Sequence, residues 1–184
     1  MILKGFKEKS IKKHINKLLS IEHSAVNNDT IESLGVILNI NEIDDFEKFR
    51  ELSTYLKIHP NKLKIIAYSD NKKEALQSWD VCFNPQDFGW KGVINNVELQ
   101  SFLDTKFDAL ISYYEADVPE LNLITALSKA HFKIGISECD ERLNDLIIKT
   151  NLKEFDVFKD EIFKYLTILK KIKRKIIFHV YGVL

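Results

Sequence analysis

The chain has 184 residues, 45% of them hydrophobic and 29% charged, which suits one domain with a sizeable core and excludes overall disorder. The formal net charge is zero, but residues 1–20 carry six lysines and one glutamate, and residues 167–184 carry four lysines, one arginine and no acid. Two basic ends around an acidic body favour binding of an anionic partner. Alternatively, the basic ends are helix faces in contact with water that bind no partner.

Residues 1–20 predict an amphipathic basic helix. Ile11, Ile15 and Leu18 recur at helical spacing on one side. The lysines lie on other sides of the helix, and four of them are candidate contacts for an anionic partner: Lys9, Lys12, Lys13 and Lys17. Residues 21–33 follow as a polar connection.

The pattern then changes to short apolar runs separated by helical segments. A first strand is predicted over 34–38, a helix capped by Asn41 over 41–57, and a second strand over 63–68. Further strands are predicted over 79–83, 107–113, 132–136 and 146–148. Further helices are predicted over 97–103, 119–130 and 155–169.

This alternation predicts an α/β domain over residues 34–170: a three-layer, mostly parallel, Rossmann-like sheet with a long C-terminal helix. Residues 171–184 form a basic and apolar tail outside it. The chain contains no apolar run long enough for a signal peptide or a membrane span, and Cys82 and Cys139 form no zinc-binding pair. We therefore expect a cytoplasmic protein with reduced thiols and no bound metal.

The loop after the first strand argues against a nucleotide cofactor. A dinucleotide site needs a glycine-rich turn there, so that backbone amides can approach the pyrophosphate. Residues 39–45 contain no glycine, and Glu42, Asp44 and Asp45 would repel phosphate. Neither a GxGxxG motif nor a P-loop occurs elsewhere, so we expect no cofactor.

Ligands of open α/β sheets usually bind outside the carboxyl ends of the strands, where Asp70, Tyr114 and Glu115 are candidates. The loop over 84–92 supplies four more: Asp87, Phe88, Trp90 and Lys91. One interpretation is an irregular crossover pinned by burying its two aromatic residues. The other is a binding loop in which the tryptophan stacks on a ligand and the two charged residues make polar contacts.

Three segments, 79–92, 107–114 and 123–136, resemble a family of uncharacterised bacterial proteins, a domain of unknown function. The likeness covers about residues 1–170 and implies no activity and no functional residue. Residues 107–136 are also similar in topology to the acceptor half of heptosyltransferase-like glycosyltransferases. Those enzymes hold the sugar nucleotide in a second Rossmann-like half, for which this chain has no room.

Three hypotheses for function follow, and the sequence does not decide whether the protein is an enzyme. The preferred one is a cytoplasmic, non-enzymatic adaptor or regulatory protein that binds a protein partner, or a second copy of itself, through residues 84–92 or the terminal helices. The second is a small enzyme or metabolite-binding protein with its site at the strand ends. The third is an RNA- or ribosome-associated protein that uses the basic ends.

Overall fold

A computed structural model describes residues 2–20, 29–71, 81–136 and 140–172. The described strands form one six-stranded sheet, all parallel, in the order β3-β2-β1-β4-β5-β6. The strands are β1 (Leu34–Asn39), β2 (Leu63–Tyr68), β3 (Val81–Phe83), β4 (Ala109–Tyr113), β5 (Lys133–Gly135) and β6 (Leu146–Ile147). The order reverses between β1 and β4, as in Rossmann-like folds, and this confirms the predicted fold class.

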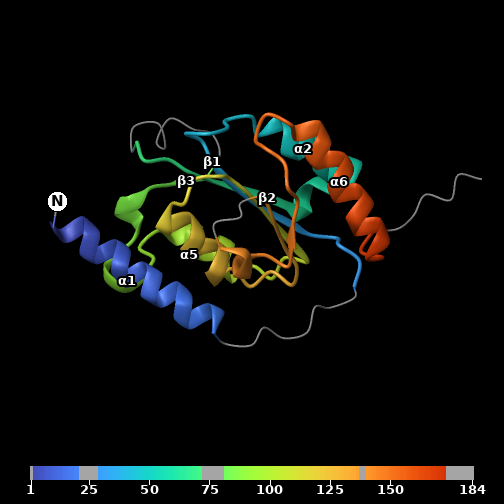
Figure 1. The fold of residues 1–184 in the computed structure, drawn as a ribbon. Helices are drawn as coiled ribbons and strands as arrows, with labels where there is room; N and C mark the ends of the chain where they lie inside the picture. Colours follow the sequence, from blue (N-terminus) through green and yellow to red (C-terminus); the bar gives the residue numbers. More distant parts are fainter. Residues whose placement is uncertain (1, 21–28, 72–80, 137–139, 173–184) are drawn as a thin grey trace, which may run out of the picture.

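Helices cover both faces of the sheet and complete three layers (Figure 1). The helices are α1 (Ile2–Leu19), α2 (Glu47–Tyr55), α4 (Val97–Asp104), α5 (Pro119–Leu127) and α6 (Phe155–Ile168). On one face α2 and α6 pack against the sheet, and Phe49, Phe155 and Phe158 meet around the Tyr113 ring there. On the other face lie α4 and α5, with α1 packed across α5.

The predicted strands are confirmed within two residues of their ends wherever the structure describes them, and residues 79 and 80 lie outside that part. Pro119 opens α5, where its missing N–H is harmless, and residues 120–126 of that helix are all buried. The helix predicted over 41–57 is wrong at its start, because α2 begins only at Glu47. The reason lies in the loop after β1, described below.

Lys133 on β5 is a buried cation. Its ammonium donates to the carbonyl oxygens of Thr125 (2.7 Å) and Ala126 (3.3 Å), so it caps the C-terminal end of α5. Burial lowers the pKa of Lys133 from 10.5 to about 8, with the Asp145 carboxylate opposing part of that shift.

This buried lysine makes stability depend on pH. Between pH 8 and 10.5 the unfolded chain holds a proton that native Lys133 has released, so stability rises with pH across that window. We expect the free energy of unfolding to increase by about 1–2 kcal/mol from pH 7.5 to 9.5. Urea denaturation at each pH measures it, and Lys133→Met should flatten the dependence. A wild-type stability that is level or falling across this range would contradict the assignment.

Candidate functional site

The region between the carboxyl ends of β1 and β4, called here the switch point, is where a Rossmann-like sheet normally receives its ligand. In this protein a side chain of the chain itself bonds to backbone amides there. The Glu42 carboxylate accepts the backbone N–H of Glu115 (3.2 Å) and the backbone N–H of Ala116 (2.8 Å). The two amides that follow β4 therefore hold a carboxylate from the loop that follows β1.

Local hydrogen bonds at the end of β1 bring Glu42 into this place. The Asn39 carbonyl oxygen accepts the N–H groups of Glu42 (3.0 Å) and Ile43 (2.9 Å), and its side-chain oxygen accepts the N–H of Asn41 (3.2 Å). The chain thus turns tightly after the strand instead of entering a helix at Asn41. Of the three carboxylates in this loop that we expect to repel phosphate, the one of Glu42 binds the two amides after β4.

A second set of bonds ties the end of β4 and the residues that follow it to the segment before α6. The Tyr113 hydroxyl donates to the Leu152 carbonyl oxygen (3.2 Å), and the Leu152 N–H donates to the Glu115 carboxylate (3.0 Å). Burial, with the nearby carboxylates of Glu115 and Glu154, raises the pKa of Tyr113 to about 12. Glu115, a candidate ligand residue, is therefore engaged within the fold through both its backbone and its side chain.

Tyr114 and Asp70, the other candidates at the strand ends, have different surroundings. Tyr114 is 1% exposed, and its hydroxyl lies 2.9 Å from the hydroxyl of Thr125 and 3.4 Å from the Asn122 side-chain oxygen that it donates to. It belongs to the packing between β4 and α5. Asp70 is exposed at the end of β2, where it contributes, after burial and Glu120, to raising the pKa of Tyr68 to about 12.

The 84–92 loop combines both interpretations made from its sequence. The Asp87 carboxylate accepts the Asn84 N–H (2.7 Å) in a capping box, so it stabilises the loop itself. Phe88 is buried with its ring 5.9 Å from that of Phe83, as the crossover interpretation expects. Trp90 is 62% exposed, and the expectation that it is buried with Phe88 is wrong.

Trp90 stands on a compact turn, residues 89–93, called here the Trp90 turn. The Gly89 N–H donates to the Val93 carbonyl oxygen (2.7 Å), and the Val93 N–H donates back to the Trp90 carbonyl oxygen (3.3 Å). Lys91 adopts a left-handed φ of 61°, and its side chain is exposed. The indole is turned outward because these backbone bonds, rather than its own burial, hold the turn.

Helix α1 fastens this turn from the side. The Lys7 ammonium donates to the Pro85 carbonyl oxygen (2.6 Å), and His14 Nδ1 donates to the Lys91 carbonyl oxygen (2.9 Å). Ile11 and Ile15 anchor the helix in the core of that face. The basic helix and the 84–92 loop, which the sequence offered as separate candidates, thus form one continuous surface.

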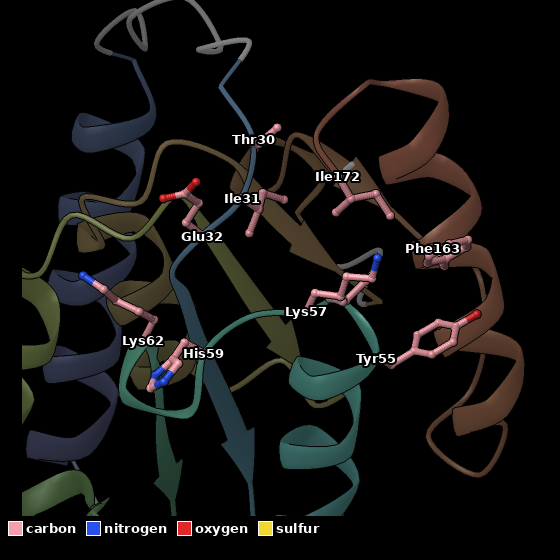
Figure 2. Close-up of a pocket in the computed structure, with 10 residues that line it drawn as sticks. Thr30, Ile31, Glu32, Tyr55, Lys57, His59, Lys62, Phe163 and Ile172 are labelled. Atoms are coloured by element: carbon pink, nitrogen blue, oxygen red, sulfur yellow. The ribbon is translucent and has the colours of Figure 1, made fainter. Parts of the chain in front are cut away.

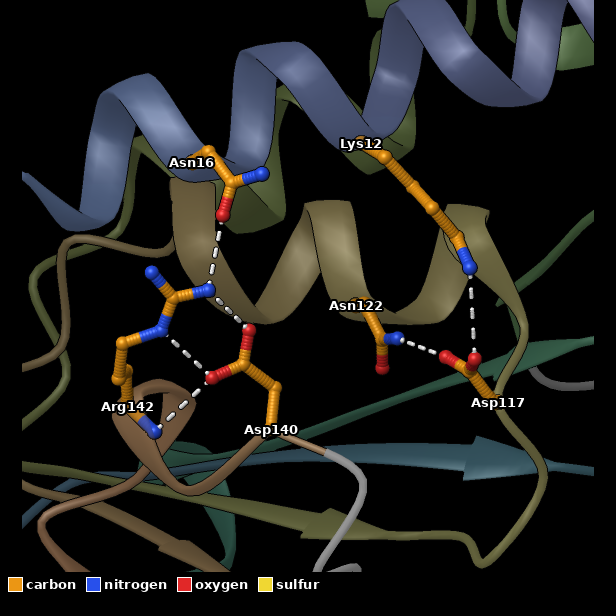
Figure 3. Close-up of polar contacts among 6 residues, drawn as sticks. All are labelled: Lys12, Asn16, Asp117, Asn122, Asp140 and Arg142. Atoms are coloured by element: carbon orange, nitrogen blue, oxygen red, sulfur yellow. Dashed lines mark hydrogen bonds and ion pairs between the residues drawn. The ribbon is translucent and has the colours of Figure 1, made fainter.

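The opposite flank of α1 is held by ion pairs and amide contacts (Figure 3). Lys12 lies 3.5 Å from the Asp117 carboxylate, and Asn16 accepts a hydrogen bond from Arg142 (2.8 Å). Arg142 is itself held by Asp140, whose pKa this pairing lowers. Of the four candidate lysines, Lys12 therefore has a role within the fold, and no spacing in the sequence could have indicated its partner more than 100 residues away.

The other three candidate lysines lie on the outward side of α1. Lys9, Lys13 and Lys17 are exposed and spaced four residues apart, so they form a stripe with about 6 Å between successive positions along the helix. On the helical wheel this stripe is opposite Ile11 and Ile15, and Phe6, also exposed, shares it. We call these four residues the outer face of α1.

In the part of the chain that the structure describes, no three His, Cys, Asp or Glu side chains gather to hold a metal ion. None of the described helices is long and apolar enough to cross a membrane.

The comparison with family models places the chain in a class. Residues 7–169 match the model of a family of unknown function, DUF6913, and the chain belongs to that family. The match begins within α1 and extends through α6, so it covers most of the basic helix and the whole described sheet. No curated protein matches the chain.

Gly92 sets the close approach of the Trp90 turn to α5. Its φ is +77°, and a Cβ atom there would lie 2.6 Å from Leu123 Cδ2. We expect Gly92→Ala to lower the free energy of unfolding by about 2 kcal/mol, because it adds backbone strain and a steric clash. Gly89→Ala is the matched control, since its φ is −80° and its nearest contact would be 3.5 Å. Chemical denaturation compares them, and equal losses would contradict this account of the turn.

Proposed function

We propose that the protein is a non-enzymatic binding protein that recruits a macromolecular partner in the cytoplasm through the Trp90 turn and the outer face of α1. The observation that carries the proposal is Trp90 itself, 62% exposed on a turn held by backbone hydrogen bonds and by α1. Burying an exposed indole against a partner is favourable, because it removes a large apolar surface from water. Tryptophan is also enriched among the residues that dominate the binding energy of interfaces.

The neighbourhood of Trp90 supports this assignment. Val93, on the same turn, is 59% exposed, and Val97 at the start of α4 is also exposed. Lys91 lies on the same turn, and the lysine stripe lies on α1, the helix that contacts this turn through His14. An apolar centre with basic residues around it suits a partner surface that is acidic around an apolar pocket. A rigid turn also pays little ordering entropy on binding.

The polar side chains at the carboxyl ends of the strands also bear on the choice between a binding protein and an enzyme. Four of the polar groups there are engaged in hydrogen bonds within the fold: Glu42, Glu115, Tyr114 and Asp87. Asp70 is exposed at the end of β2. Binding through an outer surface needs none of them. The hypothesis of a small enzyme at the strand ends therefore has less support than the binding hypothesis.

Affinity capture followed by quantitative mass spectrometry tests the proposal with three variants. Trp90→Ala removes the indole, and Lys9→Glu/Lys13→Glu/Lys17→Glu reverses the stripe without touching the Lys12–Asp117 pair. Ile168→Ala on α6 is the control, because Ile168 is 63% exposed but lies on the opposite face of the sheet. We expect partners that fall at least tenfold with Trp90→Ala and the triple variant and that persist with Ile168→Ala.

Identical partner sets for all four proteins would contradict the proposal. A nuclease-treated arm separates the third hypothesis. Partners that disappear after nuclease treatment, and whose capture falls steeply with salt, would assign the surface to RNA rather than to a protein.

A further inference from the structure

A cavity of about 310 Å³ opens at the edge of the sheet opposite the switch point (Figure 2). It lies where the chain enters β1 and β2 and where α2 and α6 end. Its volume is at the lower end of the range for sites that hold small molecules. The lining comes from four separate segments: residues 30–32, 55–59, Lys62, and the α6 end with Phe163 and Ile172.

One side of the cavity is apolar. Ile31, Leu56 and Ile172 are buried parts of the core that reach its wall. The rings of Tyr55 and Phe163 lie with their centroids 5.0 Å apart and form an aromatic wall from two helices. This side offers contact to an aromatic ring or a short aliphatic chain.

The charges around the cavity are mostly positive. Two cations, Lys57 and Lys62, line it against a single acid, Glu32, and His59 lines it as well. His59 Nδ1 accepts the Asn61 N–H, which places the proton of the neutral ring on Nε2 and leaves that atom a donor. Figure 2 shows Glu32 and Lys62 together on one side of the cavity, and Lys57 on the other side among Tyr55, Phe163 and Ile172.

Lys57 occupies a position that normally favours glycine. It follows α2 with a φ of 61°, and the Ile58 N–H closes the helix end by donating to the Ser53 carbonyl oxygen (2.8 Å). A lysine there retains backbone strain that a glycine would remove. Lys170 has the same position after α6, with a φ of 58°, but does not line the cavity. A glycine substitution at Lys170 is therefore a matched control for the same substitution at Lys57, because it changes the same backbone conformation outside the cavity.

We propose that this cavity binds a small carboxylate with an apolar body. The body lies between the Tyr55–Phe163 wall and the side chains of Ile31 and Ile172. The carboxylate is held by the Lys57 ammonium, and His59 and Lys62 line the other side of the cavity. This site is separate from the Trp90 surface and does not depend on it.

The test uses three probes that share one body: 3-phenylpropanoate, 3-phenylpropan-1-ol and 3-phenylpropylamine. Each is titrated into the isotope-labelled full-length protein while amide chemical shifts are recorded. We expect the carboxylate to bind at least tenfold more tightly than the alcohol, with the amine weakest, and the shifts to concentrate at residues 30–32, 55–59 and 163. Lys57→Gly should reduce carboxylate affinity to that of the alcohol, whereas Lys170→Gly should leave it unchanged.

Both variants relieve the same kind of backbone strain, so loss of folding cannot imitate the expected result. Three results would overturn the proposal: no shifts at the lining residues up to about 10 mM, well above the millimolar affinities expected of such fragments; equal binding of the three probes; or equal effects of Lys57→Gly and Lys170→Gly.

Discussion

The Glu42 carboxylate joins two loops across the switch point of the sheet, because it accepts the backbone amides of Glu115 and Ala116. A parallel sheet whose order reverses leaves a crevice at this point, and in Rossmann-like proteins a ligand occupies it. Here a carboxylate from the first loop occupies two of the amides that an anionic ligand would use. The chain therefore supplies its own anion to these two amides.

The scaffold leaves features suited to binding elsewhere. On one face, α1 is anchored by Ile11 and Ile15 and fastened on both flanks, so its lysine stripe and the neighbouring Trp90 turn are presented on a rigid base. At the amino ends of the strands, the C-terminal ends of α2 and α6 enclose a basic and partly apolar cavity. Neither the surface of α1 and the Trp90 turn nor this cavity includes the residues that meet at the switch point.

Much of the architecture could be predicted from the sequence, because buried parallel strands produce continuous apolar runs and α5 has apolar residues on most of its sides after Pro119. The late start of α2 follows from the tight turn that Asn39 makes with the N–H groups of Asn41, Glu42 and Ile43. The bonds of the Glu42 carboxylate could not be predicted, since they reach residues more than 70 positions away. The exposure of Trp90 and the pairing of Lys12 with Asp117 also come from tertiary contacts. The cavity could not be predicted, because the helix ends and loops that meet there share no sequence motif.

Amide hydrogen exchange at Glu115 and Ala116 tests the central claim most directly. If the Glu42 carboxylate holds these amides, Glu42→Ala should accelerate their exchange about tenfold or more, while Glu47→Ala, which removes a nearby carboxylate bonded only to Arg50 among the contacts described, should leave it unchanged. Adding a dinucleotide to the wild-type protein should leave both amides unaffected. Unchanged exchange in Glu42→Ala, or a nucleotide bound against the loop after Leu38, would contradict the account.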